Sequence, residues 1–201
     1  MNTVKSPSRN PLVVTIATAM LGAIAFVLMM LEFPLPLFVP YLKMDFGDVP
    51  AVLGAVLFGP WCGIAVELIK NLLEMLVRGL GTQLGFGNLQ NFLIGCSYML
   101  PLALIFRRSE KRHQSQRAAL AVGSALGLAT MLAVGFFSNL VVAPLFFAVF
   151  LGQPLGPGEA MGYALITFPF NAIKAVLITA VVVPLLLLGL RPIRRMMERL
   201  Q

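Results

Sequence analysis

The sequence predicts an all-α polytopic membrane protein with six transmembrane helices in a single domain, residues 1–201. Of the 201 residues, 59% are hydrophobic and 11% are charged, whereas soluble domains contain roughly 45–50% apolar and about 25% charged residues. The apolar residues form tracts long enough for bilayer crossing, which requires a helix of about 20 residues. The net charge of +7 comes from short basic clusters between these tracts, so it indicates membrane topology rather than nucleic-acid binding.

The apolar tracts, taken in chain order, predict the helices. The first tract exceeds the roughly 7–15 apolar residues of a signal peptide and no small-residue cleavage site follows it, so we expect an uncleaved span. The second and third tracts are shorter and are separated at Gly59-Pro60. Each of the last two exceeds one bilayer thickness at about 1.5 Å per residue, so each could be one tilted helix or two short ones. The tracts are residues 11–31, 49–59, 61–77, 89–106, 118–151 and 160–190.

The basic clusters decide the number of crossings. The positive-inside rule places all three clusters on the cytoplasmic side, so an even number of helices must separate consecutive clusters. This predicts four helices before the second cluster and two after it. The tails, residues 1–10 and 191–201, are then cytoplasmic, and the loops of residues 32–48, 79–88 and 152–159 lie outside. The clusters are Lys5 and Arg9; Arg107, Arg108, Lys111, Arg112 and Arg117; and Arg191, Arg194, Arg195 and Arg199.

The loop of residues 32–48 is expected to be irregular and apolar. Its three prolines exclude a regular helix, because proline lacks a backbone donor and restricts the residue before it. An apolar loop must cover something apolar, most simply a binding cavity, so we interpret it as a lid. A re-entrant packing segment is the alternative. The lid residues expected near the opening are Tyr41, Lys43, Met44, Asp45 and Phe46.

Polar side chains follow one face of the third helix at intervals of three and four residues. Ionisable groups are costly within a membrane and are functional candidates by default. Here opposite charges three or four residues apart can satisfy one another, and we favour ion pairing over direct ligand contact. The residues are Glu67, Lys70, Asn71, Glu74 and Arg78.

The fifth and sixth helices carry isolated polar residues that predict a binding pocket. Asn171 and Lys174 are three residues apart and share a helix face, and Asn139 is expected at a similar depth on the neighbouring helix. The amides could instead join helices by hydrogen bonds. Lys174 requires a partner, because a lone ammonium group is unfavourable in hydrocarbon. A ligand acceptor or Glu67 is the expected partner.

Three amides at the outer end of the fourth helix, Asn88, Gln90 and Asn91, could contribute to the same pocket. Helix capping explains Asn88 equally well. On the first helix, Ala19 and Ala23 form a small-xxx-small face, which allows close approach of another helix and predicts a docking site for a partner subunit.

The motifs of membrane-embedded catalysis and ATP binding are not found in the sequence. There is no G-x-x-x-x-G-K-[ST] phosphate loop, no G-x-S-x-G and no H-E-x-x-H. One histidine and two cysteines are too few for a metal or disulfide framework. We therefore expect neither an enzyme nor a protein with a resident cofactor.

Two motifs give the chain a resemblance to a known family. The run YLKMDFGDVPAVLGAVLFGPWCGIAVELIKNLL and the PFNAIK segment resemble the substrate-binding S components of energy-coupling factor (ECF) vitamin transporters, most of all the riboflavin-specific members. The resemblance implies riboflavin capture from outside a bacterial or archaeal cell, and transport with a T subunit and two ATPase subunits. It also implies flavin contacts from Asn139, Asn171 and Lys174, and docking of the T subunit on Ala19 and Ala23. The full candidate substrate-binding set is Tyr41, Lys43, Asp45, Glu67, Asn91, Asn139, Asn171 and Lys174.

Three alternatives remain open from the residues alone. Lys174 could pair with a carboxylate, so the substrate could be pantothenate, biotin or a folate, and thiamin is a further possibility among vitamins. A stand-alone secondary transporter could use Glu67, Lys70 and Glu74 to carry a proton. A third alternative is a helix bundle that only scaffolds other membrane proteins.

Overall fold

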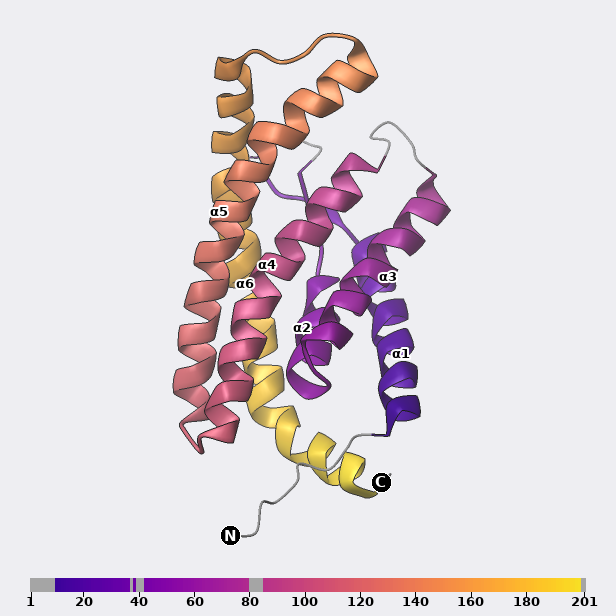
Figure 1. Cartoon of the computed structure of the whole chain (residues 1–201), viewed down its shortest axis with the longest axis vertical. Coiled ribbons are helices and arrows are strands. Elements are labelled where there is room, and N and C mark those ends of the chain that lie inside the picture. Colours follow the sequence, from indigo (N-terminus) through magenta and orange to yellow (C-terminus); the bar gives the residue numbers. More distant parts are fainter. Residues whose placement is uncertain (1–9, 37, 39–41, 80–84, 200–201) are drawn as a thin grey trace.

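The computed structural model of the chain describes residues 10–36, 38, 42–79 and 85–199 (Figure 1). Within these ranges the chain forms six helices and one short antiparallel strand pair. In chain order the elements are α1 (Pro11–Met30), β1 (Phe33–Pro34), β2 (Lys43–Met44), α2 (Asp48–Leu57), α3 (Pro60–Arg78), α4 (Phe86–Lys111), α5 (Gln116–Leu151) and α6 (Pro157–Arg199).

The two overlong tracts are each one continuous helix. α5 passes through Pro144 and α6 extends from Pro157 to Arg199, so the chain crosses once in each, as the charge argument predicts. By length and hydropathy, α1, α4, α5 and α6 are each able to span a membrane. α2 has only ten residues, and α3 has a polar face. α4 is longer than predicted at both ends. At its C-terminal end it continues into basic residues, which favour a helix C-terminus.

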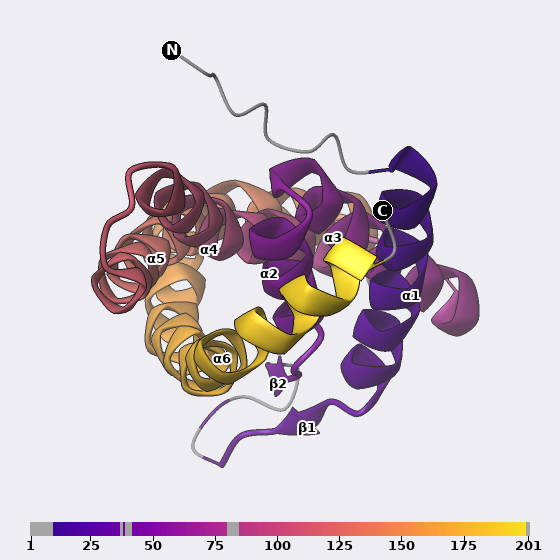
Figure 2. The same cartoon turned by 90° about the horizontal axis from the view of Figure 1, so that it is seen from below.

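α2 forms the centre of the bundle. It packs against α1, α3, α4 and α6, and every one of its residues except Leu53 is buried. α4, α5 and α6 pack together along one side, and α1 and α3 pack against each other on the other (Figures 1 and 2). This arrangement carries Asp48, the first residue of α2, into the protein interior.

The apolar segment after α1 contains the strand pair rather than being irregular throughout. Phe33 pairs with Met44 and Pro34 with Lys43. The strands lie on the side of the bundle between α1 and α6 (Figure 2), and Met44 is fully buried there. The segment therefore covers apolar interior, as its composition predicts. Tyr41, expected near the opening, lies outside the described residues.

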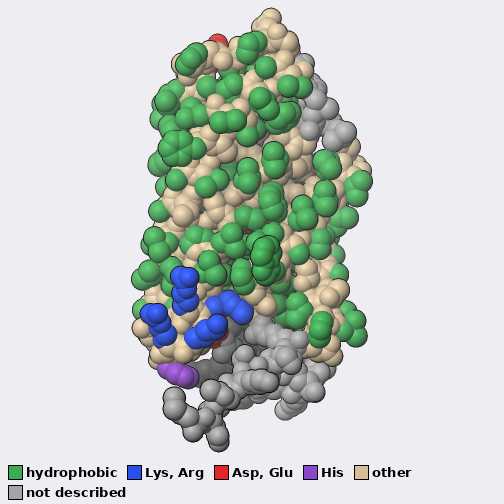
Figure 3. Space-filling view, viewed as in Figure 1, with side chains coloured by type: hydrophobic (Ala, Val, Ile, Leu, Met, Phe, Trp, Pro, Cys, Tyr) green, Lys and Arg blue, Asp and Glu red, His purple; other side chains and the backbone are tan. Residues whose placement is uncertain are grey.

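The basic residues of the α4–α5 turn gather at one end of the molecule, and hydrophobic side chains cover most of the remaining visible face (Figure 3). α1 begins and α6 ends at that same end (Figure 1). The arrangement agrees with the prediction that the second and third basic clusters lie on one side of the membrane; the first cluster, Lys5 and Arg9, lies outside the described residues.

α4 and α5 approach closely at Gly127. A methyl group at this position would lie 2.6 Å from the Tyr98 carbonyl oxygen, which belongs to the α4 backbone and cannot move independently. We expect Gly127→Ala to lower the free energy of unfolding by about 1–3 kcal/mol through overpacking. Thermal unfolding in detergent measures this. Gly162→Ala is the matched control, because no atom lies within 4 Å of its added methyl group, and equal melting temperatures for the two variants would contradict the expectation.

Candidate binding site

A cavity of about 820 Å³ lies near the end of the bundle opposite the basic α4–α5 turn. Its volume is within the roughly 300–1,000 Å³ range of small-molecule sites. The N-terminal part of α4, the C-terminal part of α5 and the first half of α6 supply most of its wall. Met29 of α1, Glu32, the C-terminal end of α3 and the segment around β2 supply the rest. The polar and charged lining residues are Glu32, Lys43, Asp45, Glu74, Arg78, Asn88, Gln90, Asn91, Asn139, Tyr163, Thr167, Asn171 and Lys174.

Aromatic rings form much of the apolar wall between α5 and α6. The rings of Phe147 and Tyr163 lie 5.4 Å apart between centroids. Phe170 packs edge-on against Phe38 of the segment between the strands, at 5.6 Å. Because aromatic rings favour stacked or edge-to-face contacts, this wall suits a flat aromatic ligand.

Two asparagines present amides from neighbouring helices to the cavity. The Asn139 Nδ2 group on α5 donates to the Gly135 carbonyl oxygen at 2.7 Å and to Thr167 Oγ1 on α6 at 2.9 Å. Both of its N–H groups are thereby used, which leaves Oδ1 as an acceptor. The Asn171 amide on α6 has no hydrogen-bond partner among the described residues, although the residue is buried. Buried amides normally have partners, so Asn171 can offer both donor and acceptor to a ligand.

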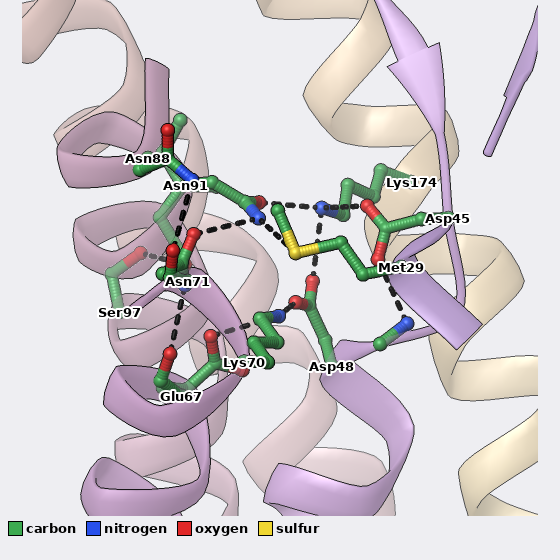
Figure 4. Close-up of polar contacts among 12 residues, drawn as sticks. Met29, Asp45, Asp48, Glu67, Lys70, Asn71, Asn88, Asn91, Ser97 and Lys174 are labelled. Atoms are coloured by element: carbon green, nitrogen blue, oxygen red, sulfur yellow. Dashed lines mark hydrogen bonds and ion pairs between the residues drawn. The ribbon is translucent and has the colours of Figure 1, made fainter. Parts of the chain in front are cut away.

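Lys174 is held at the inner end of the cavity by residues of three other segments. Its Nζ donates to Asp45 Oδ2 at 3.2 Å and to Asn91 Oδ1 at 3.0 Å, and it lies 3.1 Å from Asp48 Oδ2 (Figure 4). Asn91 in turn donates to Asn71 Oδ1 at 3.3 Å. The expectation that Glu67 pairs with Lys174 is wrong, because Asp45 and Asp48 are the carboxylates that approach it.

A second buried lysine lies behind this contact. Lys70 of α3 forms a hydrogen-bonded ion pair with Asp48 and an ion pair with Glu67 at 2.8 Å (Figure 4). Asp48 therefore joins the two lysines. The five-residue ionic network of Asp45, Asp48, Glu67, Lys70 and Lys174 contains three carboxylates and two ammonium groups, so it has one negative charge in excess when all five are ionised.

Balanced ion pairs form the opening of the cavity. Glu32 accepts hydrogen bonds from Lys43, at 2.7 Å, and from Arg78, and Arg78 also pairs with Glu74 at 3.4 Å. Burial disfavours ionisation of Glu32, but these two basic partners outweigh it and hold the pKa of Glu32 below its ordinary value. The opening therefore carries no unpaired cation in the part of the chain that is described.

The structure brings six of the predicted substrate-binding residues to the cavity and leaves Glu67 outside it. The six that line the cavity are Lys43, Asp45, Asn91, Asn139, Asn171 and Lys174. Glu67 does not line the cavity; its side chain is fully buried beside Lys70, and its role in substrate binding stays a prediction.

Lys70 pairs with Asp48 rather than with Glu74. Asn88 does not cap α4, which begins two residues earlier, but donates to Glu74 Oε2 at 2.5 Å and to the Asn71 carbonyl oxygen at 3.1 Å.

Sequence reasoning missed Asp48 and Thr167. The sequence analysis places Asp48 at the end of the loop of residues 32–48, where an acid needs no partner. Its position in the first turn of the short, buried helix α2 is the feature that could have indicated its role. Ala19 and Ala23, proposed for docking, lie on the exposed face of α1 and do not line the cavity.

The fold and the cavity together define a multi-pass membrane protein that binds a small molecule. Residues 14–186 match the family of ECF transporter substrate-specific components. Riboflavin transporter FmnP of Bacillus subtilis (strain 168) is 37% identical, over 88% of this chain and 91% of that protein. Riboflavin transporter RibU of Staphylococcus aureus (strain TCH60) is 34% identical, over 83% of this chain and 84% of that protein.

A solved structure of the S component of a bacterial ECF transporter aligns with a TM-score of 0.71 and 30% identity, covering 96% of this chain and 99% of that one. The chain belongs to the family of ECF transporter substrate-specific components. This confirms the all-α membrane fold, the resemblance drawn from the sequence motifs, and a function in transport rather than catalysis.

Proposed function

We propose that this chain is the riboflavin-binding S component of an ECF transporter. It captures riboflavin from outside the cell and delivers it inward together with a T subunit and two ATPase subunits. The relatives described above are riboflavin transporters, and they match over most of their length. The observation that carries the proposal is the cavity itself, in which aromatic rings and the two amides of Asn139 and Asn171 meet.

The chemistry of the cavity suits a flavin. Isoalloxazine is a flat aromatic body with carbonyl acceptors and an N–H donor along one edge. The aromatic wall offers ring contacts for the flat body. Asn171 offers an unpaired amide, and Asn139 offers an unpaired acceptor, for the polar edge. The ribityl hydroxyl groups can then hydrogen-bond to polar residues nearer the opening, such as Asn88 and Gln90.

The charge balance favours a neutral substrate over an anionic one. Lys174 is the only cation at the inner end of the described cavity wall, and Asp45 and Asp48 already neutralise it. A carboxylate such as that of pantothenate, biotin or a folate would find no unpaired cation there and would face the Asp45 carboxylate, and juxtaposed like charges cost several kcal/mol. Riboflavin is uncharged at neutral pH and avoids this cost.

Binding is tested by titrating the purified full-length protein with riboflavin and following the quenching of flavin fluorescence. We expect saturable one-to-one binding that an excess of pantothenate, biotin or folate does not displace. Thiamin, which is a cation, is included as a competitor because charge alone does not exclude it. Displacement of riboflavin by a carboxylate vitamin, or the absence of riboflavin binding, would contradict the proposal.

The orientation and the partner surface are part of the same proposal. The basic end of the bundle faces the cytoplasm by the positive-inside rule, so both termini are cytoplasmic and the cavity opens outward. Ala19 and Ala23 on the exposed face of α1 receive the T subunit. Small side chains there allow close helix contact.

We expect Ala19→Leu or Ala23→Leu to abolish riboflavin uptake by cells that contain the whole transporter. Riboflavin binding by the purified variants should stay within about twofold of wild type, since α1 docking residues lie outside the cavity. Met20→Leu, a similarly exposed apolar position on α1, is the control. Normal uptake with both bulky variants would place the docking surface elsewhere, and uptake in cells without the ATPase subunits would favour a stand-alone transporter.

A further inference from the structure

We propose that Gly135 of α5 is a positioning residue of the binding site. Its carbonyl oxygen fixes the Asn139 amide, and its lack of a side chain leaves room for the Asn171 amide on the facing helix. The inference rests on the proposed riboflavin function, because it concerns how the two amides are presented to that ligand. It follows from the contacts that surround Gly135 on both its backbone and its open side.

The first contact is made by the Gly135 backbone. Its carbonyl oxygen accepts a hydrogen bond from Asn139 Nδ2 at 2.7 Å, one helical turn away, and the other N–H of that amide goes to Thr167 Oγ1 at 2.9 Å. These two bonds fix the direction of the amide. Oδ1 of Asn139 is therefore the group that remains for the ligand.

The second contact lies where the Gly135 side chain is missing. A methyl group at this position would lie 2.4 Å from Asn171 Nδ2 and 3.4 Å from its Cγ, whereas the next atom, Ile94 Cδ1, is at an ordinary 3.8 Å. Among the described residues, the amide of Asn171 is therefore the group that must move. It has no hydrogen bond to any described residue, so no such bond opposes its displacement by the methyl group.

The same substitution should not harm the helix. Glycine is one of the poorest residues for a helix interior and alanine is the best. No backbone atom is among the close neighbours of the added methyl group, in contrast to Gly127, where the Tyr98 carbonyl oxygen lies at 2.6 Å. Gly135→Ala is thus expected to impair binding while leaving stability equal or higher, which is the opposite of what a packing residue would show.

The experiment compares riboflavin titrations and melting temperatures of wild type, Gly135→Ala and Gly162→Ala, all as purified full-length protein. Gly162 is also on a helix facing the cavity region, but its added methyl group meets no atom within 4 Å. We expect Gly135→Ala to weaken riboflavin binding by about tenfold or more, the size of one or more lost buried hydrogen bonds. Gly162→Ala should bind as wild type does. Wild-type affinity in Gly135→Ala would overturn the proposal.

A double-variant cycle tests whether the effect acts through Asn171. In an Asn171→Ala background the amide is already absent, so Gly135→Ala should cause no further loss beyond about twofold. An equal additional loss in that background would overturn the proposal, because it would assign the effect to general packing.

A crystal structure of ligand-free Gly135→Ala gives a readout that does not depend on riboflavin. We expect the Asn171 side chain in a different rotamer with the α5 and α6 backbones unchanged. An Asn171 amide that keeps its wild-type position would overturn the inference. If wild-type protein fails to bind riboflavin, the proposed function fails, and this structure still decides the positioning role of Gly135.

Discussion

Replacing Lys70 by methionine is expected to lower the free energy of unfolding by about 3–5 kcal/mol, the cost of removing one partner from a buried ion pair. The Lys70 side chain is fully buried, and it is the ion-pair partner of both Asp48 and Glu67. Without it, three carboxylates in the network would face the single cation of Lys174. Thermal or denaturant unfolding of the purified variant in detergent measures the effect.

Lys43→Met provides the matched control for this prediction. Lys43 also pairs with a carboxylate, Glu32, but its side chain is substantially exposed at the opening of the cavity. Exposed ion pairs contribute about 0–1 kcal/mol, so this variant should be nearly as stable as wild type. A loss for Lys70→Met no greater than for Lys43→Met would show that the buried network is not a source of stability.

A second variant separates lost charge balance from lost packing. Lys70→Met combined with Glu67→Gln restores the wild-type charge excess of the network, because one cation and one carboxylate are removed together. We expect this double variant to recover part of the stability lost in Lys70→Met, because the effects of substitutions at contacting residues are not additive. No recovery would show that the loss does not come from the Glu67 carboxylate, and would assign it to the unpaired Asp48 or to the shape of the lysine side chain.

Hydropathy was sufficient to predict most of the fold. A membrane helix must satisfy its backbone polar groups internally, so long apolar tracts have few structural options. Hydropathy alone could not decide whether the tracts of α5 and α6 each form one helix or two. The basic clusters on either side of these tracts, such as the one near Arg107, required one crossing in each. The strand pair of Phe33 and Met44 was not predicted, because two-residue strands between prolines leave no alternating pattern.

The candidate site was partly predictable for a similar reason. Asn171 and Lys174 are conspicuous because polar residues are rare in apolar helices. Asp48 is not conspicuous, since acids are common at the start of a helix, and its role follows only from the packing of α2 at the centre of the bundle. Gly135 was also not predicted, because glycine is frequent in membrane helices and its meaning depends on Asn171 of the facing helix.

The structure also changes the expected consequence of altering Lys174. Considered as a single hydrogen-bond donor, Lys174 would contribute about 1–3 kcal/mol to binding. Its Nζ, however, contacts Asp45, Asp48 and Asn91, and Asp45 Oδ1 also accepts from the Gly47 amide at the start of α2. Removal of the ammonium group would leave the Asp45 carboxylate, which lines the cavity, without its cation, while Asp48 would keep only Lys70 as a partner.

We therefore expect Lys174→Met to weaken riboflavin binding by at least about 2 kcal/mol, roughly 30-fold, the lower bound for truncating one partner of a buried charge pair at an interface. Asn171→Ala, which removes a neutral amide without stranding a charge, should cost less. Riboflavin titration of both variants, with melting temperatures to verify folding, gives the comparison. Adding Asp45→Asn to Lys174→Met should restore part of the affinity, because the stranded charge is then reduced. A Lys174→Met variant that is folded and binds no more weakly than Asn171→Ala would mean that an uncompensated Asp45 carboxylate does not weaken ligand binding.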